Sequence, residues 1–318
     1  MTWKAVRHRA EHAIVATARA LAGGLPEPLS RAMGTAIGLT FYAVDGPHRR
    51  LAVSQLAAAF PTRSAEECRR LARQTFGHFG RLVVSVLRVS TLTPAEILER
   101  VDVEGDERVR AAHAGGKGVI IFVGHFGFWE LHGIVHGIVL PPLAVLARRL
   151  DNPRLDAMVE GVRRATGNTV IYRQGALRKV LRTLDANGSV AIPIDQHIQG
   201  TNAVTVDFFE RPASTTSALA MLALRTGAPV IPAFALPLAG GRYRMIYEHP
   251  VEPPPPGSAD PVREFTQRCS DVLEMYVRRH PHLWLWMHRR WRDAPAGSVE
   301  DVRDMFPAAA PEETETAE

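Results

Sequence analysis

A change in hydrophobic rhythm near residue 118 constrains the fold of this 318-residue chain more than any other feature. From there on, short apolar runs of strand length alternate with stretches whose apolar residues recur at helical spacing. The apolar runs cover residues 119–123, 143–146, 169–172, 190–194 and 230–236, and the helical stretches lie near 155–165, 176–186 and 215–226. Because parallel strands need long crossovers, this alternation predicts an α/β fold with a mainly parallel central sheet flanked by helices.

The first hundred residues follow a helical pattern instead. Ser64, followed by Glu66 and Glu67, has the pattern of a helix start, and apolar residues then recur at helical spacing through Leu87. We therefore expect a helical region at residues 1–100 and an α/β domain at 101–307. The final segment, 308–318, carries four glutamates and little apolar content, which predicts a disordered acidic tail.

Residues 1–22 predict an amphipathic helix, with Trp3, Val6, Ile14 and Leu21 on one stripe and most of the basic residues away from it. Such a helix can lie in a membrane interface or dock on its own domain, and the segment alone favours neither. Charged residues interrupt the stretch, so we do not expect a cleaved signal peptide. Glycines and prolines divide the long apolar region 118–147, so we expect peripheral membrane association and no spanning helix.

Composition narrows the range of partners. The net charge is +5 although the tail is acidic, which favours anionic partners such as nucleic acid, a phospholipid surface or an acidic carrier protein. Aromatic and basic residues are not interleaved as in nucleic-acid readers, so we expect no nucleic-acid partner. Cys68 and Cys269 are too few for a disulfide framework or a cysteine zinc site, and we expect no metal.

His125 and Glu130 are the candidate catalytic pair. His125 follows the apolar run 119–123, at the carboxyl end of a predicted strand, where open α/β sheets place their ligands. Glu130 falls in the first turn of the next helix and could contact one imidazole nitrogen, which would fix the tautomer and make the other nitrogen a general base. A helix-capping histidine and a surface glutamate would give the same short pattern, so both interpretations stay open at this point.

Five sequence blocks, taken in order, resemble the lipid A late acyltransferases, the lauroyl and myristoyl transferases among the His-x4-Asp/Glu glycerolipid acyltransferases. The blocks are Gly-His-Phe-Gly-Phe-Trp-Glu at 124–130, Ala-Arg-Arg-Leu-Asp-Asn-Pro at 147–153, Ile-Asp-Gln at 194–196, Phe-Phe-Glu-Arg-Pro-Ala-Ser-Thr-Thr at 208–216, and Pro-His-Leu-Trp-Leu-Trp-Met-His-Arg-Arg-Trp at 281–291. Arg149 replaces the usual proline of the second block, and Glu210 replaces the glycine of the fourth. The resemblance extends over residues 52–292.

The resemblance implies acyl transfer from the thioester of acyl-carrier protein, or acyl-CoA, to a hydroxyl of a lipid A precursor or related glycolipid, without a cofactor. It implies a peripheral enzyme on the cytoplasmic face of the inner membrane. His125 would take the hydroxyl proton, and Glu130 would orient the imidazole and stabilise its charged form. The implied substrate-binding residues are Arg148, Asn152, Asp195, Gln196, Thr215 and Arg289. Asp195 could instead support its loop, and N–H groups near Gly127, or Arg148, are candidates to stabilise the oxyanion.

Two alternatives remain open. The same chemistry could act on a phosphatidylinositol mannoside, another glycolipid or a lysophospholipid. The chain could also be a lipid-binding homologue without turnover, although the intact His125 and Glu130 favour an enzyme.

Overall fold

The computed structural model describes residues 3–147, 149–172 and 176–292. Its centre is a seven-stranded sheet in the order β1-β9-β8-β2-β5-β3-β4. These strands are β1 (Val101–Glu104), β2 (Val119–Val123), β3 (Leu143–Ala147), β4 (Thr169–Tyr172), β5 (Ser189–Pro193), β8 (Val230–Pro237) and β9 (Tyr243–Tyr247). Every pairing is parallel except that of β8 with β9, which confirms the predicted α/β fold class.

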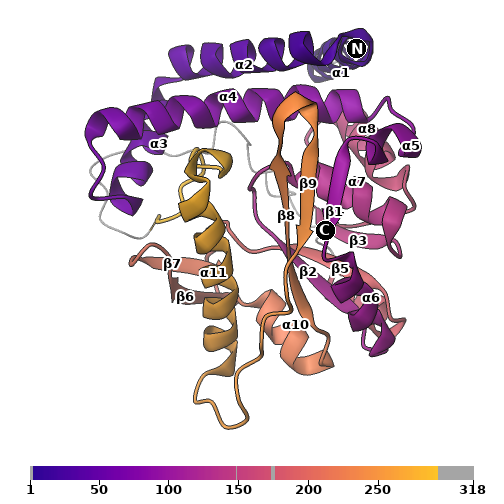
Figure 1. Cartoon of the computed structure of the whole chain (residues 1–318), viewed down its shortest axis with the longest axis vertical. Helices are drawn as coiled ribbons and strands as arrows, with labels where there is room; N and C mark the ends of the chain where they lie inside the picture. The colour runs from indigo at the N-terminus through magenta and orange to yellow at the C-terminus, as the bar shows by residue number, and fades with distance from the viewer. Residues whose placement is uncertain (1–2, 148, 173–175, 293–318) are drawn as a thin grey trace, which may run out of the picture.

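Helices cover both faces of this sheet (Figure 1). They are α6 (Asp106–Ala114), α7 (Trp129–Val139), α8 (Pro153–Arg164), α9 (Ala176–Asp185), α10 (Ala218–Thr226) and α11 (Pro261–Arg279). Alternate residues of β2 join opposite cores: Ile120 and Phe122 pack into one, Val119 and Ile121 into the other. Burial on both faces explains why the sequence of β2 is continuously apolar rather than alternating.

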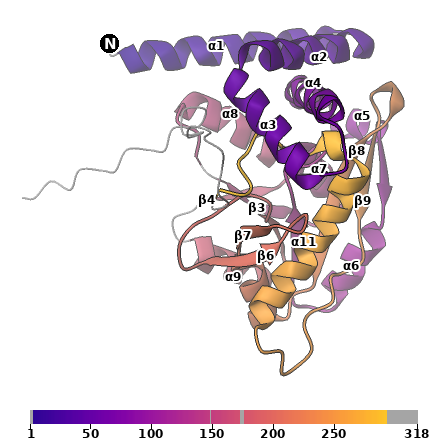
Figure 2. The ribbon, with the colours of Figure 1, turned by 90° about the vertical axis from the view of Figure 1, so that its left-hand side faces the viewer.

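The N-terminal region consists of α1 (Trp3–Gly24), α2 (Glu27–Val44), α3 (Gly46–Ala59), α4 (Ala65–Val89) and α5 (Pro94–Leu98). Figure 2 shows α1 and α2 as an outer layer beyond α4. The backbones of α2 and α4 touch, because a Cβ on Gly38 would lie 2.0 Å from the Phe76 carbonyl oxygen and one on Gly80 would lie 2.1 Å from that of Gly34. Only glycine allows so close an approach.

Three short features complete the structure. A separate antiparallel pair, β6 (Ala203–Asp207) and β7 (Pro212–Thr216), carries the fourth sequence block. Two single 3-10 turns, η1 (Ala239–Gly241) and η2 (Pro281–Leu283), follow β8 and α11. Among the described helices, none has the length and apolarity needed to cross a bilayer. The predicted acidic tail, 308–318, lies outside the described residues.

Candidate active site

The site forms where the carboxyl ends of β2 and β5 lie side by side. The register of these parallel strands pairs Val123 with Pro193, so the residues two positions further on, His125 and Asp195, are brought together. Imidazole Nδ1 of His125 lies 2.8 Å from Oδ1 of Asp195, and the backbone N–H of His125 donates to Oδ2 at 2.6 Å. A carboxylate therefore holds both the backbone and the ring of the histidine.

Asp195 is buried, with 2% of its side chain exposed. A third donor, the indole Nε1 of Trp284, lies 3.0 Å from Oδ2. Burial alone would raise the pKa of Asp195, but the charge of His125 and the hydrogen bonds from His125 and Trp284 outweigh it and lower the pKa to about 2. Asp195 is consequently a carboxylate at neutral pH and can only accept hydrogen bonds.

An acceptor at Nδ1 places the proton of neutral His125 on that nitrogen and leaves Nε2 as the unprotonated nitrogen, the one that can act as a base. The His125 side chain is 23% exposed. The side-chain amide nitrogen of Gln196 lies 3.4 Å from Nε2 of His125. The ring of Trp129 packs against the imidazole at a centroid distance of 5.3 Å. Burial would lower the pKa of His125, but the neighbouring Asp195, helped by Glu130, raises it above the ordinary value of 6.5.

The predicted contact between Glu130 and the imidazole is corrected by the structure. Glu130 instead forms a two-pronged ion pair with Arg163 of α8, with Oε1 2.7 Å from Nη2 and Oε2 3.3 Å from Nε. Both side chains are about three-quarters buried. Because α7 begins at Trp129, Glu130 extends from its first turn to the neighbouring helix, while the end of β5 supplies the carboxylate on Nδ1.

Asn152 has a structural place rather than the predicted place on a substrate. Its Oδ1 caps α8 by accepting from Arg154 N at 3.0 Å, and its Nδ2 donates to the carbonyl of His8 and the carboxylate of Glu11 in α1, both at 2.9 Å. The amide is buried and its hydrogen bonds are used within the protein. Beside it, residues 149–151 and His8 line a cavity of about 460 Å³.

Asp195, Gln196 and Thr215 also have defined places. Asp195 is the partner of His125, which agrees with the loop-supporting alternative and not with a sugar contact. Gln196 lies beside the imidazole and stays a candidate for substrate binding. Thr215 is completely buried and its hydroxyl accepts from the Arg290 guanidinium, which gives it a place in the packing beside the site. Arg289 is partly buried, and Arg148 lies outside the described residues.

The predicted oxyanion donor at Gly127 is also corrected. Its N–H donates to the carbonyl of Leu283 at 2.9 Å, and its own carbonyl accepts from His78 Nε2 at 3.0 Å. Gly127 has φ of +60°, and a Cβ there would lie 2.0 Å from the carbonyl oxygen of Ala235. The glycine lets the loop pass close to β8, and its N–H is already used.

The sequence did not point to the residue that holds the segment 286–290 in place. Gln55 of α3 donates to the carbonyls of Trp286 and His288 at 2.7 and 2.8 Å and accepts from the N–H of Arg290 at 2.8 Å. Buried Arg290 donates to the carbonyl of Ser214 at 2.6 Å, and burial lowers its pKa to about 10 despite the nearby Asp195. A lone glutamine inside a helix has no motif, whereas the Trp-x-His-Arg-Arg block did mark this segment.

The sequence model of a family described as bacterial lipid A biosynthesis acyltransferase matches residues 4–293. The lipid A biosynthesis palmitoleoyltransferase of Escherichia coli K12 is 25% identical over 275 residues, which cover 86% of this chain and 88% of that protein. A phosphatidylinositol mannoside acyltransferase of Mycobacterium tuberculosis H37Rv is 25% identical over 223 residues, 67% of each chain. The solved 1-acyl-sn-glycerophosphate acyltransferase PlsC of Thermotoga maritima aligns with a TM-score of 0.35 and 15% identity, over 79% of this chain and 98% of that one. Since the family match extends over nearly the whole chain, the protein is a member of the bacterial lipid A biosynthesis acyltransferase family.

Proposed function

We propose that the protein transfers a fatty acyl chain from the thioester of acyl-carrier protein to a hydroxyl of a lipid A precursor or a related glycolipid. One observation carries the proposal: His125 is held at Nδ1 by a buried carboxylate, its side chain is 23% exposed, and its Nε2 lies beside the side-chain amide of Gln196. This arrangement suits a general base whose pKa the neighbouring carboxylate raises. The family membership and the relatives named above support the choice of acyl transfer.

The proposed reaction needs two proton transfers and no covalent enzyme intermediate. Nε2 of His125 takes the proton of the acceptor hydroxyl as that oxygen attacks the thioester carbonyl carbon. The tetrahedral intermediate collapses, the carbon–sulfur bond breaks, and the leaving thiolate receives the proton from Nε2. Asp195 keeps the imidazole in the reactive tautomer and stabilises the imidazolium between the two steps.

We place the oxyanion donors at the start of α7. This helix begins at Trp129, whose ring contacts His125, and the preceding Phe128 offers no side-chain acceptor to the first-turn N–H groups. A helix N-terminus carries partial positive charge and suits a developing oxyanion. Glu130, paired with Arg163, would then fix the position of this helix end relative to α8.

The donor and the location are parts of the same proposal. Acyl-carrier protein is acidic and suits the basic chain, while acyl-CoA is the alternative donor. We propose peripheral attachment on the cytoplasmic face of the inner membrane. One side of α1 docks on the protein, since Arg19 donates to the carbonyl and hydroxyl of Ser90 at 2.7 and 2.8 Å. Val6 and Leu21 of α1 are 42% and 62% exposed and could contact lipid.

A phosphatidylinositol mannoside is the second candidate acceptor, favoured by the mycobacterial relative at 25% identity. The test is to incubate the purified protein with acyl-carrier-protein or CoA thioesters and either acceptor, and to identify products by mass spectrometry. We expect an acylated lipid A precursor from the wild type and a loss of about 10²–10⁴-fold in rate with His125→Ala. A product from the mannoside alone would reverse the choice of acceptor. A folded wild type inactive with every pair would favour the lipid-binding homologue.

A further inference from the structure

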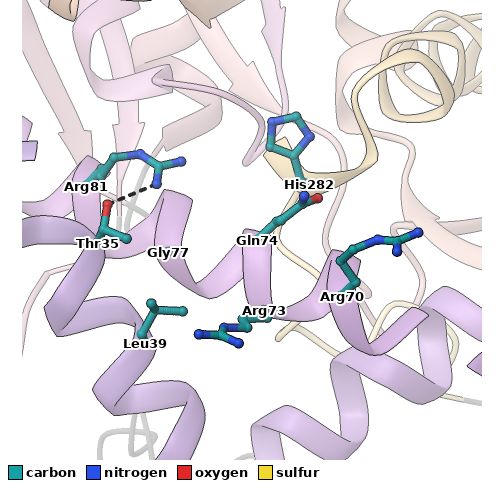
Figure 3. A pocket seen from close by; sticks show the side chains of 8 residues that line it. All are labelled: Thr35, Leu39, Arg70, Arg73, Gln74, Gly77, Arg81 and His282. Carbon is teal, nitrogen blue, oxygen red and sulfur yellow. Dashed lines mark hydrogen bonds between the residues drawn. The ribbon is translucent and has the colours of Figure 1, made fainter. Parts of the chain in front are cut away.

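A basic cavity of about 380 Å³ lies between α2, α4 and η2, outside the site described above. Figure 3 shows three arginines and a glutamine following one another along α4, with α2 on one side and His282 on the other. The described lining residues are Thr35, Leu39, Arg70, Arg73, Gln74, Gly77, Arg81 and His282, and none of them is acidic. Arginine forks favour phosphate and carboxylate groups, so the cavity is built for an anion.

The charge within this cavity is poorly balanced by the protein. Arg81 is half-buried and donates to the hydroxyl of Thr35 at 3.2 Å, a neutral acceptor. Burial lowers the pKa of Arg81, and the positive charge of Arg31 on α2 lowers it further. Arg70 is 3.9 Å from Glu67, an exposed i,i+3 pair of the kind that contributes little. A bound anion would relieve this repulsion.

The outer face of α2, beside this cavity, is apolar. Its inner face uses Gly34 and Gly38 to contact α4, and every exposed residue on the rest of the helix is uncharged. Leu29, Ile37 and Val44 are 57%, 50% and 74% exposed. A long apolar helix face beside basic residues is typical of a helix lying in a membrane interface.

The apolar face and the cavity are continuous. On a helical wheel, the exposed alanines of α2 at 32, 36 and 43 lead directly to Leu39, which lines the cavity. Because Leu39 of α2 lines the same cavity as the arginines of α4, a bilayer touching this face would bring its headgroups close to those arginines. An acidic protein would satisfy the arginines but would leave the apolar face without a matching surface.

We propose that the arginines of α4 that line this cavity bind the phosphate of an anionic phospholipid, while the exposed face of α2 rests in the bilayer. The inference rests on the proposed membrane association and not on turnover. It assigns membrane binding to α2 and α4 in addition to α1, and it makes attachment depend on the lipid charge.

The test is vesicle co-sedimentation of the full chain. One set of vesicles is phosphatidylcholine, and the other is an equal mixture of phosphatidylcholine and phosphatidylglycerol. The double variant Arg70→Gln/Arg73→Gln removes two exposed arginines of the cavity, so folding should be preserved, as thermal melting will check. The matched control, Arg178→Gln/Arg182→Gln, removes the same charge from exposed positions of α9, which Figure 2 shows far from the layer of α1 and α2.

Each arginine near an anionic surface contributes about five-fold in affinity, so the cavity variant should lose about 20–30-fold in partitioning to the mixed vesicles. We expect the control to change by less than about three-fold and both variants to bind phosphatidylcholine alike. Equal losses in the two variants, or none in either, would overturn the proposal. The proposal would also be overturned if the cavity variant bound the mixed vesicles as well as the wild type does, but had lost the wild type's response to inorganic phosphate or its binding of acyl-carrier protein. Inactive wild type that partitions as expected would contradict the proposed function alone.

Discussion

Asp195→Asn is the sharpest test of the site because the structure fixes how the new amide must lie. Oδ2 of Asp195 accepts from two fixed donors, His125 N at 2.6 Å and Trp284 Nε1 at 3.0 Å. An asparagine must place its carbonyl oxygen there, so its NH₂ group occupies the position of Oδ1, 2.8 Å from Nδ1 of His125. The imidazole must then accept at Nδ1 and carry its proton on Nε2.

That tautomer cannot take a proton from the acceptor hydroxyl. Replacing the equivalent tautomer-setting aspartate of serine proteases by asparagine lowers kcat by about 10⁴, and we expect a loss of about 10³–10⁴ here. The fold should be retained, since the two hydrogen bonds to Oδ2 persist and the third, to Nδ1, is kept with its direction reversed. The control Trp284→Phe removes one of those bonds and leaves the carboxylate on Nδ1, so it should cost about ten-fold or less.

The measurements are kcat from thioester cleavage and the imidazole tautomer from nitrogen-15 chemical shifts. An Asp195→Asn protein that is folded, has its proton on Nε2 and retains activity within about ten-fold of the wild type would refute the general-base argument. Loss of activity with Nδ1 still protonated would show that the charge of Asp195 matters rather than the tautomer. That result would require a different account of the pair.

Three further predictions follow from the contacts and the burial of charged and titratable groups. Since the buried carboxylate raises the pKa of His125, kcat/KM should fall on acidification with a midpoint above pH 6.5, and a midpoint below it would contradict the electrostatics. Glu130→Gln leaves Arg163 without its charged partner, so unfolding free energy should fall by about 1–2 kcal/mol in urea titrations, with a smaller loss of kcat than Asp195→Asn. His132 and His136 are buried with pKa values of about 3, against 6.5 when unfolded, so the unfolded state binds more protons below pH 6.5. The free energy of unfolding should therefore decrease as the pH is lowered, by about 2 kcal/mol per histidine at pH 5. Urea midpoints that stay unchanged from pH 8 to pH 5 would contradict this.

The central sheet could be predicted because its strands are buried on both faces. The run predicted at 190–194 corresponds to β5 at Ser189–Pro193, and that at 119–123 is β2 itself. The strands that escaped prediction are less apolar. β7 consists of proline, alanine, serine and threonines, and β1 has only two valines among its four residues. Pattern alone finds a strand only where the surrounding core demands apolar side chains.

The site was predicted in part because motifs describe neighbours along the chain. His125 follows a strand, and that position was correct, since the carboxyl end of β2 faces the partner loop. Gln55 and Trp284 could not be given roles, because their partners lie 231 and 89 residues away. Buried polar contacts at such separations depend on how helices and loops pack, which local patterns do not encode.

The identity of the imidazole partner depends on strand order. β3 follows β2 in the chain, yet β5 lies between them in the sheet and pairs with both. Crossover helices allow several such orders, so the sequence could not decide which strand end lies beside His125. Glu130 was the nearest carboxylate along the chain, but a residue in the first turn of α7 shares a helix surface with residues three and four positions on, and there it meets α8. Asp195 lies beside His125 because each residue stands two positions beyond the end of its strand and the two strands are parallel neighbours. In an open parallel sheet, acidic residues two positions beyond any strand end are therefore partners to consider for such a histidine, alongside the carboxylate within the motif.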